Sequence, residues 1–141
     1  MNFFQVWSAV HSVRGQTKVE TGRWNPHRNY HQFATVCGSQ VVAWDTRTSD
    51  QCWTLHNSVS SQSIRTVDFN PNKQYYMVTG CDDGCVSVWD TRNSGEVLLS
   101  SRQHSHWVWS TRSYISKMSR MFYMIGHMAQ IHHKGFAREF G

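Results

Sequence analysis

A tetrapeptide that occurs twice places the strongest constraint on how this chain folds. Trp44-Asp45-Thr46-Arg47 recurs as Trp89-Asp90-Thr91-Arg92, 45 residues further along, and Asn25-Pro26 recurs at the same spacing as Asn70-Pro71. A repeat of this length predicts two copies of one supersecondary unit that stack side by side. The alignment extends without a gap through further pairs: Tyr30 and Tyr75, Val41 and Val86, Ser49 and Ser94, and the aromatic residues Trp24 and Phe69.

Each repeat contains the patterns of four short strands. Residues 64–69 alternate apolar and polar, as a half-buried strand does, and residues 75–79, 86–89 and 96–100 are predicted as the next three strands. Asp82-Asp83-Gly84 is a hairpin signal, because Asp-Gly tolerates the positive φ of a tight turn. In the first repeat the predicted strands are one that ends at Trp24, followed by residues 32–36, 41–44 and 52–55.

Four strands per repeat, with Trp-Asp at the end of the third, are typical of WD-repeat β-propeller blades. We therefore predict an all-β fold, a partial WD40 β-propeller with two four-stranded antiparallel blades at about residues 20–56 and 60–100. Residues 104–117 begin a third blade, so that the WD-repeat region spans residues 15–117. Residues 118–141 lack turn signals at blade spacing and are predicted as a separate tail, irregular or helical.

Composition and charge exclude several classes of protein. Hydrophobic residues make up 39% of the chain and charged residues 16%, which excludes a disordered charged tail. The net charge is +5, but no dense Lys/Arg cluster indicates a nucleic-acid surface. No apolar run reaches the length of a membrane span, and no secretory signal is evident, so we expect no direct membrane insertion. The four Cys are expected to be reduced thiols in the cytosol.

The motifs of catalysis and metal binding are absent from the sequence. It contains neither a Gly-x-Ser-x-Gly elbow nor a phosphate loop, and adjacent Asp82 and Asp83 before a Gly indicate a turn rather than an acid–base pair. Cys81 and Cys85 have no matching second pair for zinc. His104, His106, His132 and His133 lack a carboxylate or Cys at ligand spacing. We predict no enzyme, no metal and no cofactor.

Several segments resemble the family of EARP and GARP complex-interacting proteins, which are WD-repeat partners of endosomal tethering complexes. The most specific are the runs Asp68-Phe69-Asn70-Pro71-Asn72-Lys73-Gln74-Tyr75-Tyr76 and His104-Ser105-His106-Trp107-Val108-Trp109. The resemblance covers residues 15–117 and not the tail. It implies a non-enzymatic scaffold that binds tether subunits at the cytosolic face of endosomes and the trans-Golgi network, in endocytic recycling and endosome-to-Golgi retrieval.

The WD-repeat pattern assigns structural roles to six residues: Trp44, Asp45, Thr79, Asp83, Trp89 and Asp90. In WD repeats the strand Trp is linked through a buried hydrogen-bond network to a Ser or Thr, an Asp and a His. Thr79 and Asp83 stand in the matching places for Trp89, whereas Ser60 stands where the His is expected and His104 matches the loop His. The first repeat has Ala34 and Gly38 in place of Thr79 and Asp83, so its network is predicted to be absent.

Four exposed side chains are candidate partner contacts. Trp-Asp-x-Arg motifs occur in propellers that serve as substrate receptors of cullin-RING ubiquitin ligases, where the Arg contacts the adaptor. Arg47 and Arg92 fit that spacing, or each pairs with a nearby Asp, a contact worth little. Trp107 and Trp109 alternate on one predicted strand and share a face. There they either pack against a next blade or form an exposed apolar patch of the kind that marks interfaces.

Three functional interpretations follow from these features. The first is an adaptor for endosomal tethering complexes, the second a ubiquitin-ligase substrate receptor and the third a truncated, non-functional product. Two blades and the start of a third expose strand edges, which are templates for association. We therefore also expect self-association through open blade edges, or completion by another chain.

Overall fold

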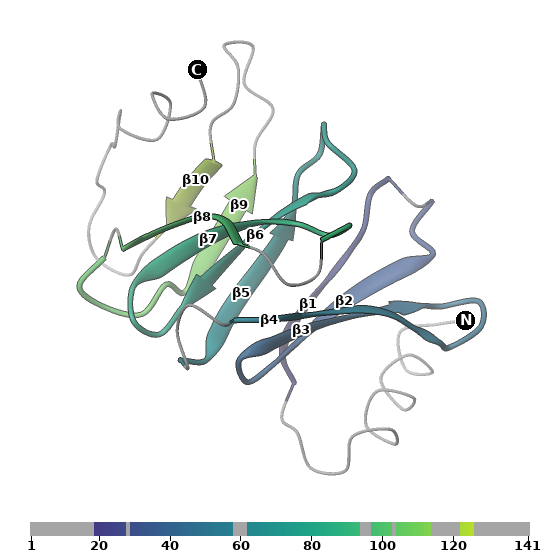
Figure 1. The fold of residues 1–141 in the computed structure, drawn as a ribbon, viewed down its shortest axis with the longest axis horizontal. Coiled ribbons are helices and arrows are strands. Elements are labelled where there is room, and N and C mark those ends of the chain that lie inside the picture. The colour runs from purple at the N-terminus through teal and green to yellow at the C-terminus, as the bar shows by residue number, and fades with distance from the viewer. Residues whose placement is uncertain are drawn as a thin grey trace.

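The computed structural model describes residues 19–27, 29–57, 62–93, 97–102, 104–113 and 122–125, and their regular elements are all strands (Figure 1). Two four-stranded antiparallel sheets, each with its strands in chain order, confirm the predicted partial propeller. The first blade contains β1 (Val19–Trp24), β2 (Gln32–Cys37), β3 (Gln40–Asp45) and β4 (Gln51–His56). The second contains β5 (Ile64–Phe69), β6 (Tyr76–Cys81), β7 (Cys85–Asp90) and β8 (Val97–Arg102).

A third, two-stranded sheet follows the second blade. Its strands, β9 (Ser110–Ser113) and β10 (Phe122–Ile125), pair antiparallel, and β9 lies against β5 and β6. For residues 122–125 the predicted irregular or helical tail is therefore wrong, and the rest of the tail lies outside the described residues. Phe-Tyr-Met-Ile has high β-propensity, and pairing with β9 satisfies backbone groups that an isolated strand leaves open.

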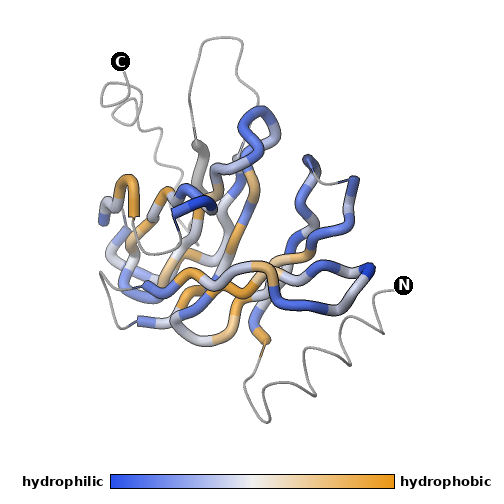
Figure 2. Tube along the Cα trace, turned by 45° about the vertical axis from the view of Figure 1, so that its right-hand side comes forward, coloured by the Kyte–Doolittle hydropathy of each residue, from blue (hydrophilic) through white to orange (hydrophobic). Residues whose placement is uncertain are grey.

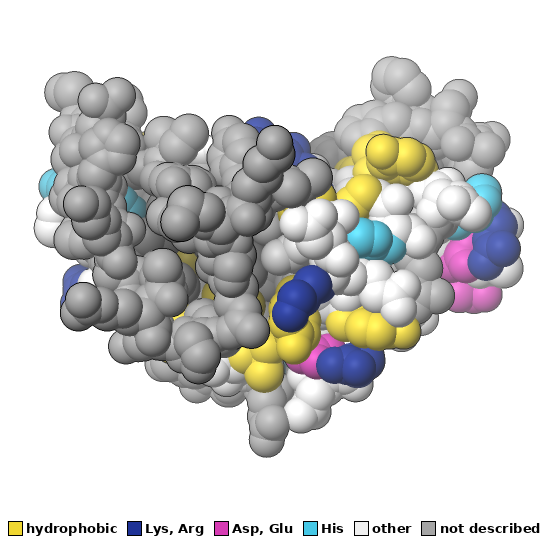
Figure 3. All heavy atoms as spheres, turned by 90° about the horizontal axis from the view of Figure 1, so that it is seen from above, with side chains coloured by type: hydrophobic (Ala, Val, Ile, Leu, Met, Phe, Trp, Pro, Cys, Tyr) yellow, Lys and Arg dark blue, Asp and Glu magenta, His cyan; other side chains and the backbone are white. Residues whose placement is uncertain are grey.

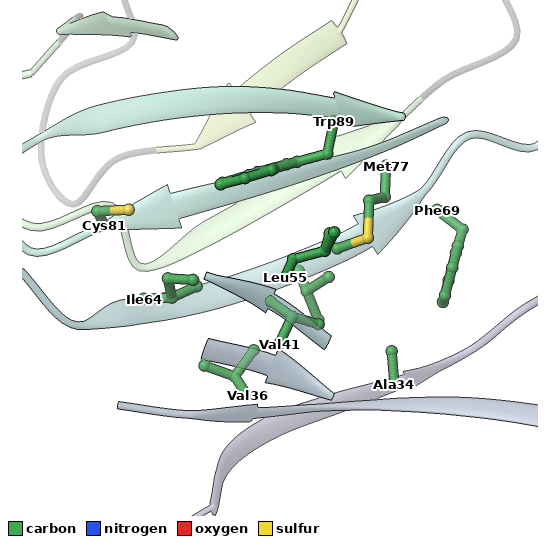
Figure 4. Packing of buried hydrophobic residues seen from close by; sticks show 10 residues of the cluster. Ala34, Val36, Val41, Leu55, Ile64, Phe69, Met77, Cys81 and Trp89 are labelled. Atoms are coloured by element: carbon green, nitrogen blue, oxygen red, sulfur yellow. The ribbon is translucent and has the colours of Figure 1, made fainter. Parts of the chain in front are cut away.

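The main core lies between the first and second blades. Side chains alternate across a strand, and one face of the first blade presents Ala34, Val36, Val41 and Leu55, each fully buried. This face meets Trp89 and other buried residues of the second blade: Ile64, Val67, Phe69, Met77 and Cys81 (Figure 4). Figure 2 shows that hydrophobic residues are concentrated in the strands and hydrophilic residues in the turns. Burial of these facing apolar surfaces holds the blades together.

Polar contacts join the first strand of each sheet to that of the next. Arg23 of β1 lies 3.9 Å from Asp68 of β5, whose carboxylate also accepts a 2.8 Å hydrogen bond from the Ser113 N–H of β9. The hydroxyls of Thr66 and Thr111 are 3.2 Å apart. Because these partners recur at the repeat spacing, the period read from the sequence is also the period of inter-blade contacts.

The two blades do not superpose without gaps, so the gap-free alignment is wrong between its end points. Trp44 pairs across the sheet with Phe33. Trp89 pairs with Met77, which comes one residue earlier in the chain than the gap-free alignment predicts. The β1–β2 turn of the first blade is one residue longer than its counterpart, and its β2–β3 turn is one residue shorter. The two changes cancel, which is why the flanking motifs keep a constant spacing.

The same shift changes which residue corresponds to Tyr75. The carbonyl oxygen of Tyr75 accepts the Thr91 N–H, and in the first blade it is His31 whose carbonyl accepts the Thr46 N–H, each at 2.8 Å. Tyr30 instead has a positive φ of 56° in the longer turn and is 62% exposed. The predicted pair of Tyr30 with Tyr75 is therefore replaced by His31 with Tyr75.

Candidate protein-interaction surfaces

The tryptophans of the two repeated motifs donate equivalent buried hydrogen bonds. Trp89 donates its indole N–H to the Thr79 hydroxyl at 2.9 Å, and Trp44 donates to the Thr35 hydroxyl at 3.0 Å. Thr35 in turn donates to the Val42 carbonyl at 3.2 Å. The prediction that the first blade lacks this network is thus wrong for its Trp–Thr bond. The one-residue shift turns Ala34 to the opposite face and brings Thr35 beneath Trp44.

Asp83 and the loop histidine, His104, both hold the β6–β7 hairpin. Asp83 accepts the Cys85 N–H at 3.0 Å and so closes the β6–β7 hairpin, in which Gly84 has a φ of 82°. The backbone of His104 lies over this hairpin and donates its N–H to the Gly84 carbonyl at 3.3 Å. The predicted position of Ser60 lies outside the described residues.

Replacing Thr35 by Val tests the corrected register. The substitution keeps the side-chain shape but leaves the buried Trp44 N–H without its acceptor, which should lower the free energy of unfolding by about 1–3 kcal/mol. Thr79→Val should cost a similar amount. The side-chain hydroxyl of half-buried Thr21 has no hydrogen bond to another described residue, so Thr21→Val should stay within about 0.5 kcal/mol in urea titrations. Equal costs for Thr35→Val and Thr21→Val would contradict the assignment of Thr35, rather than Ala34, as the partner of Trp44.

The Asp and Arg of each Trp-Asp-Thr-Arg motif form a two-pronged ion pair. Arg47 donates Nε and Nη2 to Asp45 at 3.2 and 2.8 Å, and Arg92 donates the same two nitrogens to Asp90 at 2.9 and 2.5 Å. These hydrogen bonds hold the pKa of each carboxyl below its usual value, so both pairs are ionised at neutral pH. Paired basic and acidic side chains are visible on the face shown in Figure 3.

The structure brings Arg47 and Arg92 to one cleft. The cleft has a volume of about 610 Å³ and is lined by residues of both four-stranded blades. It lies at the rim where β3 and β7 end, and the arginine side chains there are 64% and 59% exposed. Each arginine therefore pairs with its neighbouring Asp, which is one of the two roles predicted from the sequence. Most of each arginine side chain remains exposed to solvent.

Trp107 and Trp109 lie together at the opposite rim. They precede β9 rather than lying within a strand, as had been predicted, yet the segment still alternates: Val108 is fully buried, while Trp107 and Trp109 are 45% and 53% exposed. Their ring centroids are 5.5 Å apart. The sharing of one face is retained because the extended backbone turns successive side chains to opposite sides.

Arg65 holds this tryptophan pair and was not identified from the sequence. Its guanidinium carbon lies 4.6 Å from the Trp107 ring centroid and 5.9 Å from that of Trp109. Two of its nitrogens donate to Asp82, and a third lies 3.7 Å from Glu20 of β1. Arg65 thereby connects the two blades and the segment before β9 at one rim. The sequence gives only a weak signal for this role. Arg65 lies one repeat after Glu20, and the two side chains come together only when the blades stack.

The described segments show neither a metal-site cluster nor a membrane-spanning helix. In those segments no three His, Cys, Asp or Glu side chains gather as a metal site, and no helix is long and apolar enough to cross a bilayer. Burial raises the pKa of Cys81 to about 12, so this thiol stays protonated and is a poor ligand. His132 and His133 lie outside the described residues.

Comparison with known proteins identifies relatives of this chain. The family model described as the EIPR1 beta-propeller matches residues 7–117. The rat and human proteins named EARP and GARP complex-interacting protein 1 are 47% and 46% identical over 105 residues. The EARP-interacting protein homolog of Gekko japonicus is 44% identical over the same length. Each match covers 74% of this chain and 27% of the relative, so the chain spans about a quarter of these relatives.

A solved structure shows the same fold at low sequence identity. The crystal structure of the Myceliophteria thermophila Cps50 (Swd1) beta-propeller domain aligns with a TM-score of 0.56 and 19% identity. The alignment covers 66% of this chain and 28% of that domain. At this identity the likeness concerns the blade architecture alone.

Proposed function

Because the chain belongs to the EIPR1 β-propeller family, we propose that it is a non-enzymatic adaptor that binds subunits of the EARP and GARP complexes. In this proposal it acts at the cytosolic face of endosomes and the trans-Golgi network, in endocytic recycling and endosome-to-Golgi retrieval. The relatives named for binding these complexes support the choice of partner. Because this chain spans about a quarter of those relatives, the statement that it shares their partners is itself part of the proposal.

We propose that the exposed pair of Trp107 and Trp109 is the surface that binds these subunits. Tryptophan is enriched among the residues that dominate binding energy at interfaces. Here both rings are about half exposed and are fixed by Arg65 before any partner arrives. A preordered contact loses little conformational entropy on binding. The run from His104 to Trp109 is also one of the segments that most resemble the family.

Changing Trp107 and Trp109 together to Ala should reduce recovery of tether subunits by tenfold or more, because truncating a binding hot spot costs about 2 kcal/mol or more. The measurement is affinity purification of the tagged chain followed by quantitative mass spectrometry. Tyr30→Ala is the matched control, since Tyr30 is an exposed aromatic residue at the opposite rim.

The same purification distinguishes the other interpretations. Unchanged recovery of tether subunits by the Trp107/Trp109 variant would exclude this surface, and recovery of chaperones alone would favour a non-functional product. Recovery of a cullin adaptor that is lost on changing Arg47 and Arg92 would favour the ligase interpretation. Size-exclusion chromatography of each sample separates partner binding from the self-association that we propose for exposed strand edges.

A further inference from the structure

A cleft lies between the first and second blades and is lined by residues of both. Its volume of about 610 Å³ lies within the common range for ligand sites. The turns of the first blade and the starting end of β4 form one wall, and Gln74, Tyr75, Thr91 and Arg92 of the second blade form the other. The cleft therefore exists only where two blades meet, at the rim away from the tryptophan pair.

The two arginines of the cleft are held in place and still have donors to offer. Each uses Nε and Nη2 for its own Asp, and neither Nη1 has a hydrogen-bond acceptor among the described residues. The Arg92 guanidinium also lies over the Tyr75 ring, 4.5 Å from its centroid. A guanidinium has five N–H groups, so the Nη1/Nη2 end of each can donate to the two oxygens of a carboxylate in a second two-pronged contact.

The charges that line the cleft favour an anion. Arg47 and Arg92 face it together with one carboxylate, that of Asp45. Asp90, the partner of Arg92, is not part of the lining, and its side chain is only 11% exposed. The cleft thus presents two guanidinium groups, whereas only one of their two carboxylate partners, Asp45, reaches its lining.

The remaining lining suits a peptide better than an isolated anion. The side chains of Asn29 and Gln74 make no hydrogen bond to other described residues, and the amide nitrogen of Gln32 is likewise unused, since Gln32 accepts from Asn25 through its oxygen. Side-chain amides can both donate to and accept from a peptide backbone. Trp53 adds an aromatic surface for a side chain.

We propose that this inter-blade cleft binds an acidic peptide segment of a partner protein, whose Asp or Glu carboxylates contact Arg47 and Arg92 end-on. The peptide backbone is bound by the amides of Asn29, Gln32 and Gln74. This site is independent of the proposed adaptor role, because it lies at the other rim and its ligand is defined by chemistry rather than by complex membership.

Fluorescence anisotropy with the full chain tests the proposal. The probe is a labelled peptide of alternating Glu and Ser, compared with the same peptide carrying Gln in place of Glu. We expect the Glu peptide to bind at least tenfold more tightly than the Gln peptide, and Arg47→Gln/Arg92→Gln to weaken its binding about tenfold or more. Arg102→Gln, which removes an exposed arginine at the opposite rim, should change the affinity less than about twofold.

Three outcomes would overturn the proposal. The first is equal affinity for the Glu and Gln peptides, and the second is unchanged binding by the Arg47/Arg92 double variant with native circular dichroism. The third is full displacement of the peptide by millimolar inorganic phosphate, which would identify a site for isolated anions. Arg92→Lys separates charge from geometry: it keeps the charge but not the fork, and it should lose at least half of the double variant's effect.

Discussion

Replacing Trp89 by Ala should lower the free energy of unfolding by about 3–5 kcal/mol, the range for large aromatic residues removed from a core. Trp89 is fully buried in the cluster between the blades, next to residues of both sheets (Figure 4). The substitution leaves a cavity at this interface and removes the donor to Thr79, whose buried hydroxyl then loses its partner. A loss of this size is a large part of the stability of a typical domain.

Urea titration followed by circular dichroism measures this effect. Trp107→Ala is the matched control, because it removes the same side chain from a site that is 45% exposed. We expect the control to cost about 1 kcal/mol or less, since part of that ring is already in water and no sealed cavity forms. Comparable losses for the two variants would show that the inter-blade cluster does not contribute as the packing implies.

Replacing Gly84 by Ala should cost about 2–5 kcal/mol. The φ of 82° is strained for any residue with a Cβ, and a Cβ at this position would lie 2.0 Å from the His104 carbonyl oxygen. That oxygen belongs to the backbone of the loop that carries Trp107, so the loop must move to accommodate the methyl group. Both the hairpin and the start of the third sheet are therefore affected.

Gly38→Ala provides the control for this variant. Gly38 is in the corresponding hairpin of the first blade and also has a positive φ, of 59°, but no atom lies within 4 Å of the added Cβ. Its cost should be about 1 kcal/mol, from backbone strain alone. Thermal unfolding of both variants measures the difference. Equal shifts would mean that the loop after β8 does not rest on the β6–β7 hairpin.

Sequence alone predicted the all-β fold and most of the strands. The second blade's first strand was predicted with its observed bounds, and the other strands of the two blades were placed within a few residues of theirs. These successes rest on local signals: alternation within a strand, turn residues between strands, and a Trp-Asp-Thr-Arg motif that recurs once per blade. Such signals act over a few residues and need no knowledge of the partner sheet.

The errors of register in the first blade share one physical cause. A longer turn and a shorter turn cancel within the first blade, so residue spacing is preserved at the motifs while the strand between them shifts by one position. Thr35 rather than Ala34 therefore meets Trp44. The strand at residues 122–125 was missed because its pairing depends on β9, not on any local turn signal.

The amino-acid sequence by itself determined the blade unit, its period and the family to which the chain is related. The tertiary structure alone decided the contacts between units: Trp44 with Thr35, Arg65 with two tryptophans and two carboxylates, and Arg47 with Arg92 in one cleft. The reason is that a strand's pattern records which side of the strand is buried. Which residue of the neighbouring sheet meets that side depends on register and stacking, which are set by turn lengths and packing across the whole repeat.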